Sequence, residues 1–293
     1  MSQTLASQHQ KERAIIEVFP QPHAIRVNGT ELTYVEQGAG VPLVLVHGAF
    51  GDYRDWMELF QSFAQCYRVV AYSRRRNWPN AWPEDDSGCE TPIQVADLAA
   101  LIDVLELGPA HLMGYSYGAI IALLLAAERP DLVRSLILGE APLLRWLAAM
   151  PDGQPVVADF AANVVDPFRD AFTRDQVESG VRVFIDGVIG HGAFDQIPAL
   201  IQAAIMDNAA EWRLHAEAGE ADWPPFFYEN ARNVHVPTLL LSGELSPPLF
   251  QLSTDELARC LPMVERLTIP DVSHDLWNPS LTTEAVFGFL ARH

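Results

Sequence analysis

One serine stands between two glycines in the stretch HLMGYSYGAI, residues 111–120. The apolar run before it is typical of a buried strand, and the run rich in alanine and leucine after it is typical of a helix. Gly114 and Gly118 leave room for a sharp strand-to-helix turn, which would hold Ser116 clear of the backbone at the carboxyl edge of a sheet. There its hydroxyl could act as a nucleophile. The plainer alternative is a tight turn whose serine only caps the helix.

A serine nucleophile needs a base, and His274 is the best placed of the nine histidines. It lies in TIPDVSHDLWNP, a polar loop between the last apolar strand run and a C-terminal helical stretch. Loops that follow parallel strands meet at one edge of the sheet, so we expect His274 within reach of Ser116. His47 is expected to brace the loop in which it lies, and the others are expected near the termini, before the first hairpin strand, at the opposite edge of the sheet or in a long insertion.

A glycine-rich loop, VHGAFGD, follows the first buried strand run at residues 46–52. Backbone N–H groups in such a loop can face the serine and stabilise the negative oxygen that forms when a carbonyl is attacked. We expect the N–H groups of Ala49 and Tyr117 to form this oxyanion hole.

The elements that must position these residues alternate along the chain. Six short apolar runs are typical of strands buried on both faces, at residues 41–48, 67–73, 110–116, 133–140, 237–244 and 265–271. They alternate with helical stretches, and a hairpin around Asn28-Gly29 precedes them. This pattern predicts an α/β fold with a doubly wound, mostly parallel sheet.

Residues 143–230 break the alternation, because they contain several helical segments and many aromatic residues where a crossover would be short. We expect an inserted helical cap at 143–230, a core formed by residues 21–142 and 231–293, and an N-terminal arm at 1–20. Aromatic residues of such a cap could line an apolar pocket. The side chains expected to bind substrate are Phe50, Tyr115, Trp146 and Trp212.

The order of these motifs, HGAFG, GYSYG, the long insertion and a late SHD, resembles the α/β-hydrolase superfamily, in its small, cap-bearing branch of esterases, lactonases and C–C hydrolases. The resemblance covers roughly residues 22–293. It implies a Ser–His–acid triad with no metal and no cofactor. Ser116 separates the chain from epoxide hydrolases and haloalkane dehalogenases, which are similar but carry aspartate at the elbow.

The acid of the triad departs from the family pattern. The family usually places it as G-x-x-D after the strand that follows the cap, and SGELSPP holds Ser246 at that position. We favour Glu140, which ends an apolar strand run in LILGEAP, because a carboxylate there is costly unless it is paired. Some dehalogenases of the superfamily keep their acid at this strand end. Glu244, two residues before Ser246, and a site without an acid remain open.

The amino-acid composition argues against several classes of binding partner and of stabilising site. The formal net charge of −19 disfavours nucleic acids and anionic membranes, and the three widely spaced cysteines suggest neither a disulfide framework nor a zinc site. The polar N-terminus lacks the apolar core of a secretion signal, and no apolar run reaches the ~18 residues that span a bilayer. We therefore expect a cytoplasmic protein with a small-molecule substrate, and a homodimer remains open.

These features predict a serine hydrolase of small to medium apolar carboxylic esters or lactones that works through an acyl-enzyme on Ser116. The alternatives are a C–C bond hydrolase of diketone-type substrates and a ligand receptor that keeps the triad but turns over little. Arg74, Arg75 and Arg76 could clamp a carboxylate. We expect instead that one arginine braces its loop through an ion pair and that the others are solvated.

Overall fold

The computed structural model describes residues 20–82, 90–219, 223–276 and 279–293. The expected N-terminal arm therefore lies outside the described residues, except for Pro20.

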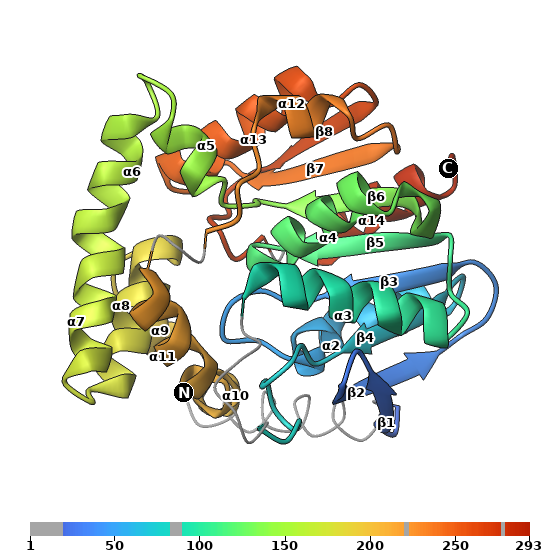
Figure 1. Ribbon diagram of the computed structural model, residues 1–293, viewed down its shortest axis with the longest axis horizontal. Helices are drawn as coiled ribbons and strands as arrows, with labels where there is room; N and C mark the ends of the chain where they lie inside the picture. The colour runs from blue at the N-terminus through green and yellow to red at the C-terminus, as the bar shows by residue number, and fades with distance from the viewer. Residues whose placement is uncertain (1–19, 83–89, 220–222, 277–278) are drawn as a thin grey trace.

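An eight-stranded sheet forms the centre of the molecule, in the order β1-β2-β4-β3-β5-β6-β7-β8 (Figure 1). β1 (His23–Val27) and β2 (Thr30–Gln37) form an antiparallel hairpin at one edge, and β2 also pairs antiparallel with β4. The remaining strands are parallel to one another: β3 (Pro42–Val46), β4 (Arg68–Tyr72), β5 (Ala110–Tyr115), β6 (Val133–Gly139), β7 (Thr238–Gly243) and β8 (Val264–Ile269). The predicted fold class, a mostly parallel α/β sheet, is confirmed.

Helices cover both faces of this sheet. One face carries α3 (Thr91–Val104), α4 (Tyr117–Glu128) and α13 (Pro248–Cys260), and the other carries α2 (Met57–Ala64) and α14 (Pro279–Leu290). Side chains alternate between the two faces along each strand, as the period of two in a strand requires. In β3, Val44 and Val46 pack toward α3 and α4, whereas Leu43 and Leu45 pack toward α2.

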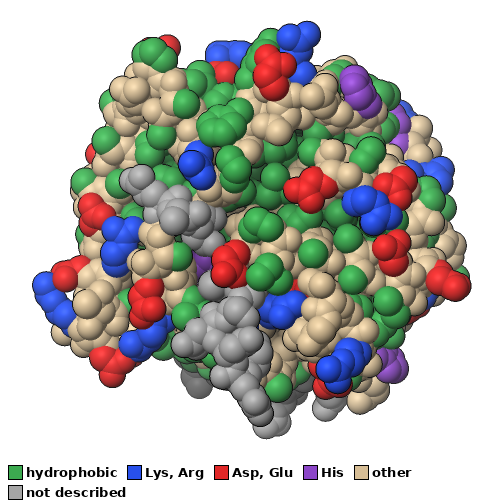
Figure 2. Space-filling view, viewed as in Figure 1, with side chains coloured by type: hydrophobic (Ala, Val, Ile, Leu, Met, Phe, Trp, Pro, Cys, Tyr) green, Lys and Arg blue, Asp and Glu red, His purple; other side chains and the backbone are tan. Residues whose placement is uncertain are grey.

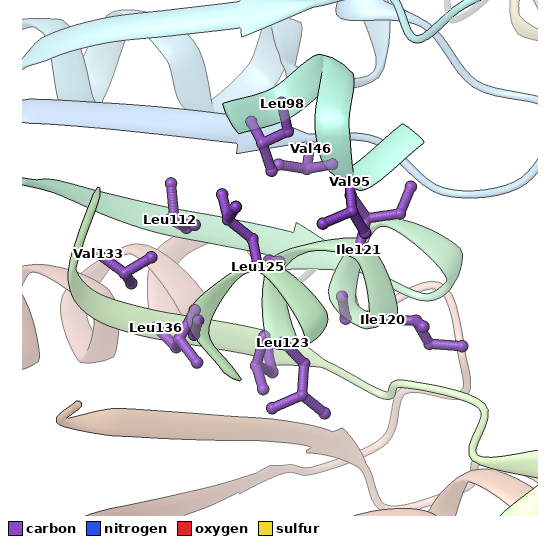
Figure 3. Packing of buried hydrophobic residues seen from close by; sticks show 14 of the residues in the cluster. Val46, Val95, Leu98, Leu112, Ile120, Ile121, Leu123, Leu125, Val133 and Leu136 are labelled. Atoms are coloured by element: carbon purple, nitrogen blue, oxygen red, sulfur yellow. The ribbon is translucent and has the colours of Figure 1, made fainter. Parts of the chain in front are cut away.

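On the α4 side of the core, strand side chains pack against helices α3 and α4 (Figure 3). Helix α4 is apolar nearly all round its circumference, and its residues from Tyr117 to Leu123 are all buried. Such a helix is held on every side by its neighbours. It therefore provides a rigid support for the serine that precedes it.

A second group of helices lies between β6 and β7 in the chain and beyond the carboxyl ends of the parallel strands (Figure 1). These helices are α5 (Leu144–Ala148), α6 (Gln154–Phe160), the π-helical turn η3 (Ala161–Val165), α7 (Asp166–Thr173), α8 (Val177–Ile189), α9 (Ala193–Gln196), α10 (Ala199–Asp207) and α11 (Ala209–Ala218). We call them the inserted helices. The short helix α12 (Tyr228–Arg232) follows them in the chain and lies beside α13 (Figure 1). Helices α7, α8, α9 and α11 pack through an aromatic cluster onto Phe50, which follows β3, whereas α5 and α6 pack onto Leu249 and Phe250 of α13.

Short connections complete the chain as described: the 3-10 turns η1 (Tyr53–Trp56) before α2 and η2 (Pro130–Leu132) before β6. Among the described helices, none has both the length and the apolar character needed to cross a bilayer. Figure 2 shows acidic and basic side chains dispersed among apolar ones over the face that it draws. On that face, the excess negative charge is not gathered into one patch.

Candidate active site

Ser116 occupies the turn between β5 and α4, with φ 52° and ψ −119°. Non-glycine residues rarely adopt a positive φ, and the conformation costs on the order of 1–3 kcal/mol that the surrounding structure must supply. The rigid packing of α4 supplies it here. As predicted, the residue sits in a strained elbow at the carboxyl edge of the sheet.

The two glycines that flank the serine have no room for a side chain. A Cβ on Gly118 would lie 2.1 Å from the carbonyl oxygen of Val46, and one on Gly114 would lie 2.5 Å from the carbonyl oxygen of Gly118. Both collisions are with backbone atoms, which cannot move aside without disturbing the sheet. The glycines therefore allow α4 to approach β3 and β5 closely enough to form the elbow.

His274 lies on the loop after β8, and its Nε2 is 3.0 Å from Ser116 Oγ. The imidazole is buried and stacks on the ring of Phe250 from α13, with ring centroids 3.7 Å apart. The backbone of the same loop is held as well, because the Tyr115 hydroxyl donates a hydrogen bond to the His274 carbonyl oxygen. Burial, and then the nearby Glu140 carboxylate, raise the pKa of Tyr115 well above its usual value, so it remains a donor.

Glu140 follows β6, and its Oε2 lies 2.6 Å from His274 Nδ1. Its other oxygen, Oε1, accepts a hydrogen bond of 2.8 Å from the N–H of Gly243. The alternative acid, Glu244, is exposed and accepts a hydrogen bond of 3.2 Å from the N–H of Asp271. The structure thus brings Glu140, and not Glu244, to the histidine.

These contacts define the hydrogen-bonding state of the imidazole. A carboxylate oxygen can only accept, so His274 Nδ1 must carry a hydrogen and donate it to Glu140. In a neutral imidazole the other nitrogen, Nε2, then bears a lone pair. That lone pair faces the Ser116 hydroxyl, an arrangement that can accept the hydroxyl proton.

The glycine-rich loop after β3 runs directly against the serine. A Cβ on Gly48 would lie 3.3 Å from Ser116 Cβ and 3.2 Å from the Tyr115 carbonyl oxygen, so the loop packs closely against the serine turn. The next residue, Ala49, lines the same cavity as Ser116 and Tyr117. Tyr117 is the first residue of α4, and N–H groups in the first turn of a helix have no acceptor within the helix. The predicted oxyanion-hole residues thus border the cavity on either side of the serine.

The cavity in front of Ser116 has about 950 Å³ of empty space, including the part open to solvent. Its wall is made largely of apolar side chains contributed by α4, by the segment after β6, by the inserted helices and by α13. The aromatic residues of the inserted helices and the segment before β7 that line it are Phe160, Phe168, Phe184, Trp212, Trp223 and Phe226. The polar side chains include Arg145, Arg169 and His215.

Of the side chains predicted to bind substrate, Trp212 lines this cavity and the other three do not. Phe50 is buried behind the wall, with its ring 5.1 Å from that of Trp212. Trp146 packs against Phe226, and the Tyr115 hydroxyl is engaged with the backbone of the His274 loop. Phe50, Tyr115 and Trp146 thus lie behind the cavity wall, against neighbouring aromatic rings and backbone, and their contact with substrate stays a prediction.

The arginine run after β4 also differs from expectation. Arg74 is fully buried and forms an ion pair with the equally buried Glu211 of α11, at 2.9 Å. Arg75 pairs with Asp97 at 2.7 Å with 11% of its side chain exposed, and Arg76 is 2% exposed. The prediction that all but one of these arginines are solvated is wrong, since the loop turns back under the inserted helices and the β1–β2 hairpin.

Two residues at the site have no counterpart in the sequence-based prediction. Phe250, which supports the imidazole, lies in a stretch whose pattern predicts only a helix. Glu211 occurs in AEWRLHAE, a mixture of charged and apolar residues that is typical of a half-exposed helix. Neither context signals its role, because each contact joins elements that are distant in the chain.

No group of three or more His, Cys, Asp or Glu side chains within the described ranges is arranged to hold a metal ion.

Comparison with known proteins agrees with this architecture. Residues 43–287 match the sequence profile of the alpha/beta hydrolase family. The pyrrolizixenacetamide deacetylase of Xenorhabdus hominickii is 24% identical over 220 residues, which cover 74% of this chain and 78% of that protein.

Two solved structures share the fold. A thermophilic esterase from Thermogutta terrifontis superposes with a TM-score of 0.74 at 22% identity, over 93% of this chain and 98% of its own. Est816, an N-acyl homoserine lactone degrading enzyme, superposes with a TM-score of 0.68 at 20% identity, over 91% of this chain and 100% of its own. Since the family profile spans most of the 293 residues and the strained serine elbow lies within it, the chain belongs to the alpha/beta hydrolase family.

Proposed function

We propose that this protein is a serine hydrolase of small to medium apolar carboxylic esters or lactones. The observation that carries the proposal is the continuous line of contacts from Glu140 through His274 to Ser116, with the Ser116 hydroxyl opening into an apolar cavity. Family membership and the ester- and lactone-cleaving activities of proteins with the same fold support the reaction class.

In the proposed reaction, Ser116 Oγ attacks the substrate carbonyl carbon while His274 Nε2 takes the hydroxyl proton. The carbonyl oxygen becomes an oxyanion that accepts hydrogen bonds from the N–H groups of Ala49 and Tyr117. Glu140 stabilises the imidazolium and keeps it oriented. When the tetrahedral intermediate collapses, the leaving alkoxide takes the proton from His274. Water then repeats the sequence on the acyl-enzyme and releases the acid.

The wall of the cavity favours apolar substrates. Burial of apolar surface contributes about 25 cal/mol per Å², or roughly 0.8 kcal/mol for each methylene. Lengthening an acyl chain from acetate to butyrate within such a wall should therefore improve kcat/KM by about tenfold, unless the chain outgrows the space. We propose further that residues 143–230, which include the inserted helices, serve as a cap that shapes this wall.

The proposal is tested with p-nitrophenyl acetate and p-nitrophenyl butyrate on the wild-type protein and on Ser116→Ala. We expect steady release of p-nitrophenol, faster for butyrate, and no release above background from Ser116→Ala. A fluorophosphonate should label Ser116, and peptide mass spectrometry would identify the modified residue.

Three other outcomes of these experiments would contradict the proposed ester hydrolysis or the proposed nucleophile. A single burst of p-nitrophenol without turnover would favour a receptor that keeps the triad. Inactivity toward esters together with cleavage of a vinylogous diketone would favour a C–C hydrolase. Label on a residue other than Ser116 would contradict the assignment of the nucleophile.

A further inference from the structure

We propose that Arg74, held by Glu211 of the inserted helices, positions the N–H of Ala49 for the transition-state oxygen. The inserted helices would then preset the oxyanion hole as well as shape the cavity. This inference rests on the proposed esterase function. It concerns two residues that are separated by 137 positions in the chain and that carry none of the reacting atoms.

The first observation is the isolation of the ion pair from solvent. Arg74 and Glu211 have no exposed side-chain surface, and the two groups meet through both guanidinium Nη atoms, at 2.9 and 3.3 Å. Asn77 also donates to Glu211, at 2.9 Å. Burial alone would raise the pKa of Glu211, but Arg74, His215 and Asn77 together lower it to about 2, so the carboxylate is charged at neutral pH.

A buried ion pair is weak evidence for stability. Removing two charges from water costs several kcal/mol for each ion, and apolar residues of similar volume often serve stability as well or better. A fully buried ion pair that also bonds the loop preceding Ala49 therefore calls for a second role.

The second observation is a further hydrogen bond from the Arg74 Nη2 atom that also meets Glu211. This atom donates to the carbonyl oxygen of Gly48 at 3.1 Å. The same oxygen lies 3.0 Å from His47 Nδ1. The backbone N–H of Arg74 donates to His47 Nε2 at 2.9 Å, so the hydrogen of the neutral ring must be on Nδ1, which donates to Gly48. Burial, and then Arg74, lower the pKa of His47 well below its usual value, which keeps the ring neutral.

The carbonyl of Gly48 and the N–H of Ala49 belong to one planar peptide unit. In a trans peptide these two groups point in opposite directions. Arg74 and His47 hold the oxygen on one side, so the N–H of Ala49 is directed to the other side, where Ala49 borders the cavity with Ser116. A charged donor on the carbonyl also polarises the peptide and strengthens its N–H as a donor.

The third observation links Arg74 to the second oxyanion donor. The Arg74 guanidinium carbon lies 4.9 Å from the centre of the Tyr117 ring. The Tyr117 hydroxyl is hydrogen-bonded to Thr91 Oγ1 at 2.9 Å. One guanidinium thus contacts the Gly48 carbonyl oxygen, which shares a peptide unit with the N–H of Ala49, and the ring of Tyr117. Arg74 and Glu211 are positioning residues, because neither needs to touch the substrate to act.

The test uses the double variant Arg74→Gln/Glu211→Gln, which removes both charges together and so avoids leaving one buried charge unpaired. Its matched control is Arg75→Gln/Asp97→Asn. Arg75 neighbours Arg74 in the chain and forms a bidentate pair with Asp97, at 2.8 and 2.7 Å, but this pair braces the β1–β2 hairpin through the carbonyl oxygen of Asn28.

The first measurement is steady-state hydrolysis of p-nitrophenyl butyrate. Loss of an oxyanion donor costs about 10²–10³ in kcat, and a displaced donor should cost part of that. We expect Arg74→Gln/Glu211→Gln to lower kcat by about 10- to 100-fold with KM changed by less than about threefold. The control variant should stay within about threefold of wild type in both constants. Thermal unfolding of each variant shows that it is folded.

The second measurement separates the oxyanion hole from general damage to the site. An alkyl trifluoromethyl ketone accepts Ser116 Oγ at its carbonyl carbon, the hydroxyl proton passes to His274, and the ketone oxygen becomes an oxyanion. The corresponding methyl ketone is the ground-state comparison. We expect the double variant to lose about the same factor in affinity for the trifluoromethyl ketone as in kcat, with little change for the methyl ketone.

The inference is overturned if a folded Arg74→Gln/Glu211→Gln variant keeps its kcat, or if KM alone rises, since the pair would then only shape the cavity. Equal losses in the control pair would overturn it as well. These outcomes differ from failure of the proposed function, which would appear as absence of Ser116-dependent turnover in the wild-type protein and would remove this inference with it.

Discussion

Substitution of Glu140 by glutamine isolates the contribution of the carboxylate with little change in shape. Both oxygens of Glu140 accept hydrogen bonds, Oε1 from the N–H of Gly243 at 2.8 Å and Oε2 from His274 Nδ1 at 2.6 Å. A glutamine offers only one acceptor oxygen to these two donors. The backbone N–H of Gly243 cannot change its hydrogen, whereas the imidazole can. The amide oxygen should therefore turn to Gly243 and leave its NH₂ group facing His274.

The imidazole must then present a lone pair at Nδ1 and carry its hydrogen on Nε2. In that tautomer Nε2 cannot take the proton of Ser116, which lies 3.0 Å away. Loss of a triad acid in this way lowers kcat by about 10²–10⁴-fold, or about 3–5 kcal/mol of transition-state stabilisation. KM for p-nitrophenyl butyrate should change little, because Glu140 is behind the histidine and does not line the cavity.

The assay is steady-state hydrolysis of p-nitrophenyl butyrate by Glu140→Gln, with Glu244→Gln as the control and thermal unfolding of both. Glu244 is an exposed carboxylate on the neighbouring strand end, so its amide should leave kcat almost unchanged. Equal and mild losses in the two variants would refute the assignment of Glu140. A large loss in Glu244→Gln alone would transfer the role to that residue.

Three further expectations concern the elbow, a buried histidine and the support of the imidazole. Gly118→Ala places a Cβ 2.1 Å from the Val46 carbonyl oxygen, so urea denaturation should show at least about 3 kcal/mol of lost stability. A wild-type midpoint would contradict the reasoning. Burial lowers the pKa of His111 from 6.5 to about 4. As the pH falls from 6.5 to 4, His111 is therefore protonated in the unfolded chain before it is protonated in the folded one, and the free energy of unfolding should fall by about 3 kcal/mol. His111→Gln should flatten that part of a plot of unfolding free energy against pH, and an unchanged slope would count against it. Phe250→Ala removes the ring stacked 3.7 Å from His274 and should cost about 3–5 kcal/mol of stability, with kcat reduced by about tenfold because the imidazole loses its support. Measurement of kcat and of urea unfolding on one preparation would check both, and an unaltered kcat would show that the loop alone orients the histidine.

Much of the site could be predicted from contiguous residues. The turn at Ser116 requires glycine two positions before and two positions after it, because backbone oxygens lie where a Cβ of residue 114 or 118 would be. The motif GYSYG shows this requirement directly. Strands buried on both faces appear as apolar runs because every side chain in them meets a helix. His274 could be placed at the serine's edge of the sheet from its position after the last run alone.

The pattern of strands in the sequence does not by itself decide whether Glu140 or Glu244 is the acid that contacts His274. Both residues end parallel strands that are neighbours in the sheet, so the sequence places two carboxylates at one edge. Burial of Glu140 and its two donors distinguish them, because a buried carboxylate must find partners while an exposed one is satisfied by water.

By itself the sequence determined the sheet, the elbow and the edge of the sheet where the histidine lies, because each depends on local backbone geometry and on the periodicity of burial. Tertiary structure alone decided which aromatic rings reach the cavity and that Arg74 meets Glu211. Those outcomes depend on how the inserted helices pack on the loops after β3 and β4. Many helices of similar composition could pack there in other ways, so residue type and spacing do not specify which side chains come into contact.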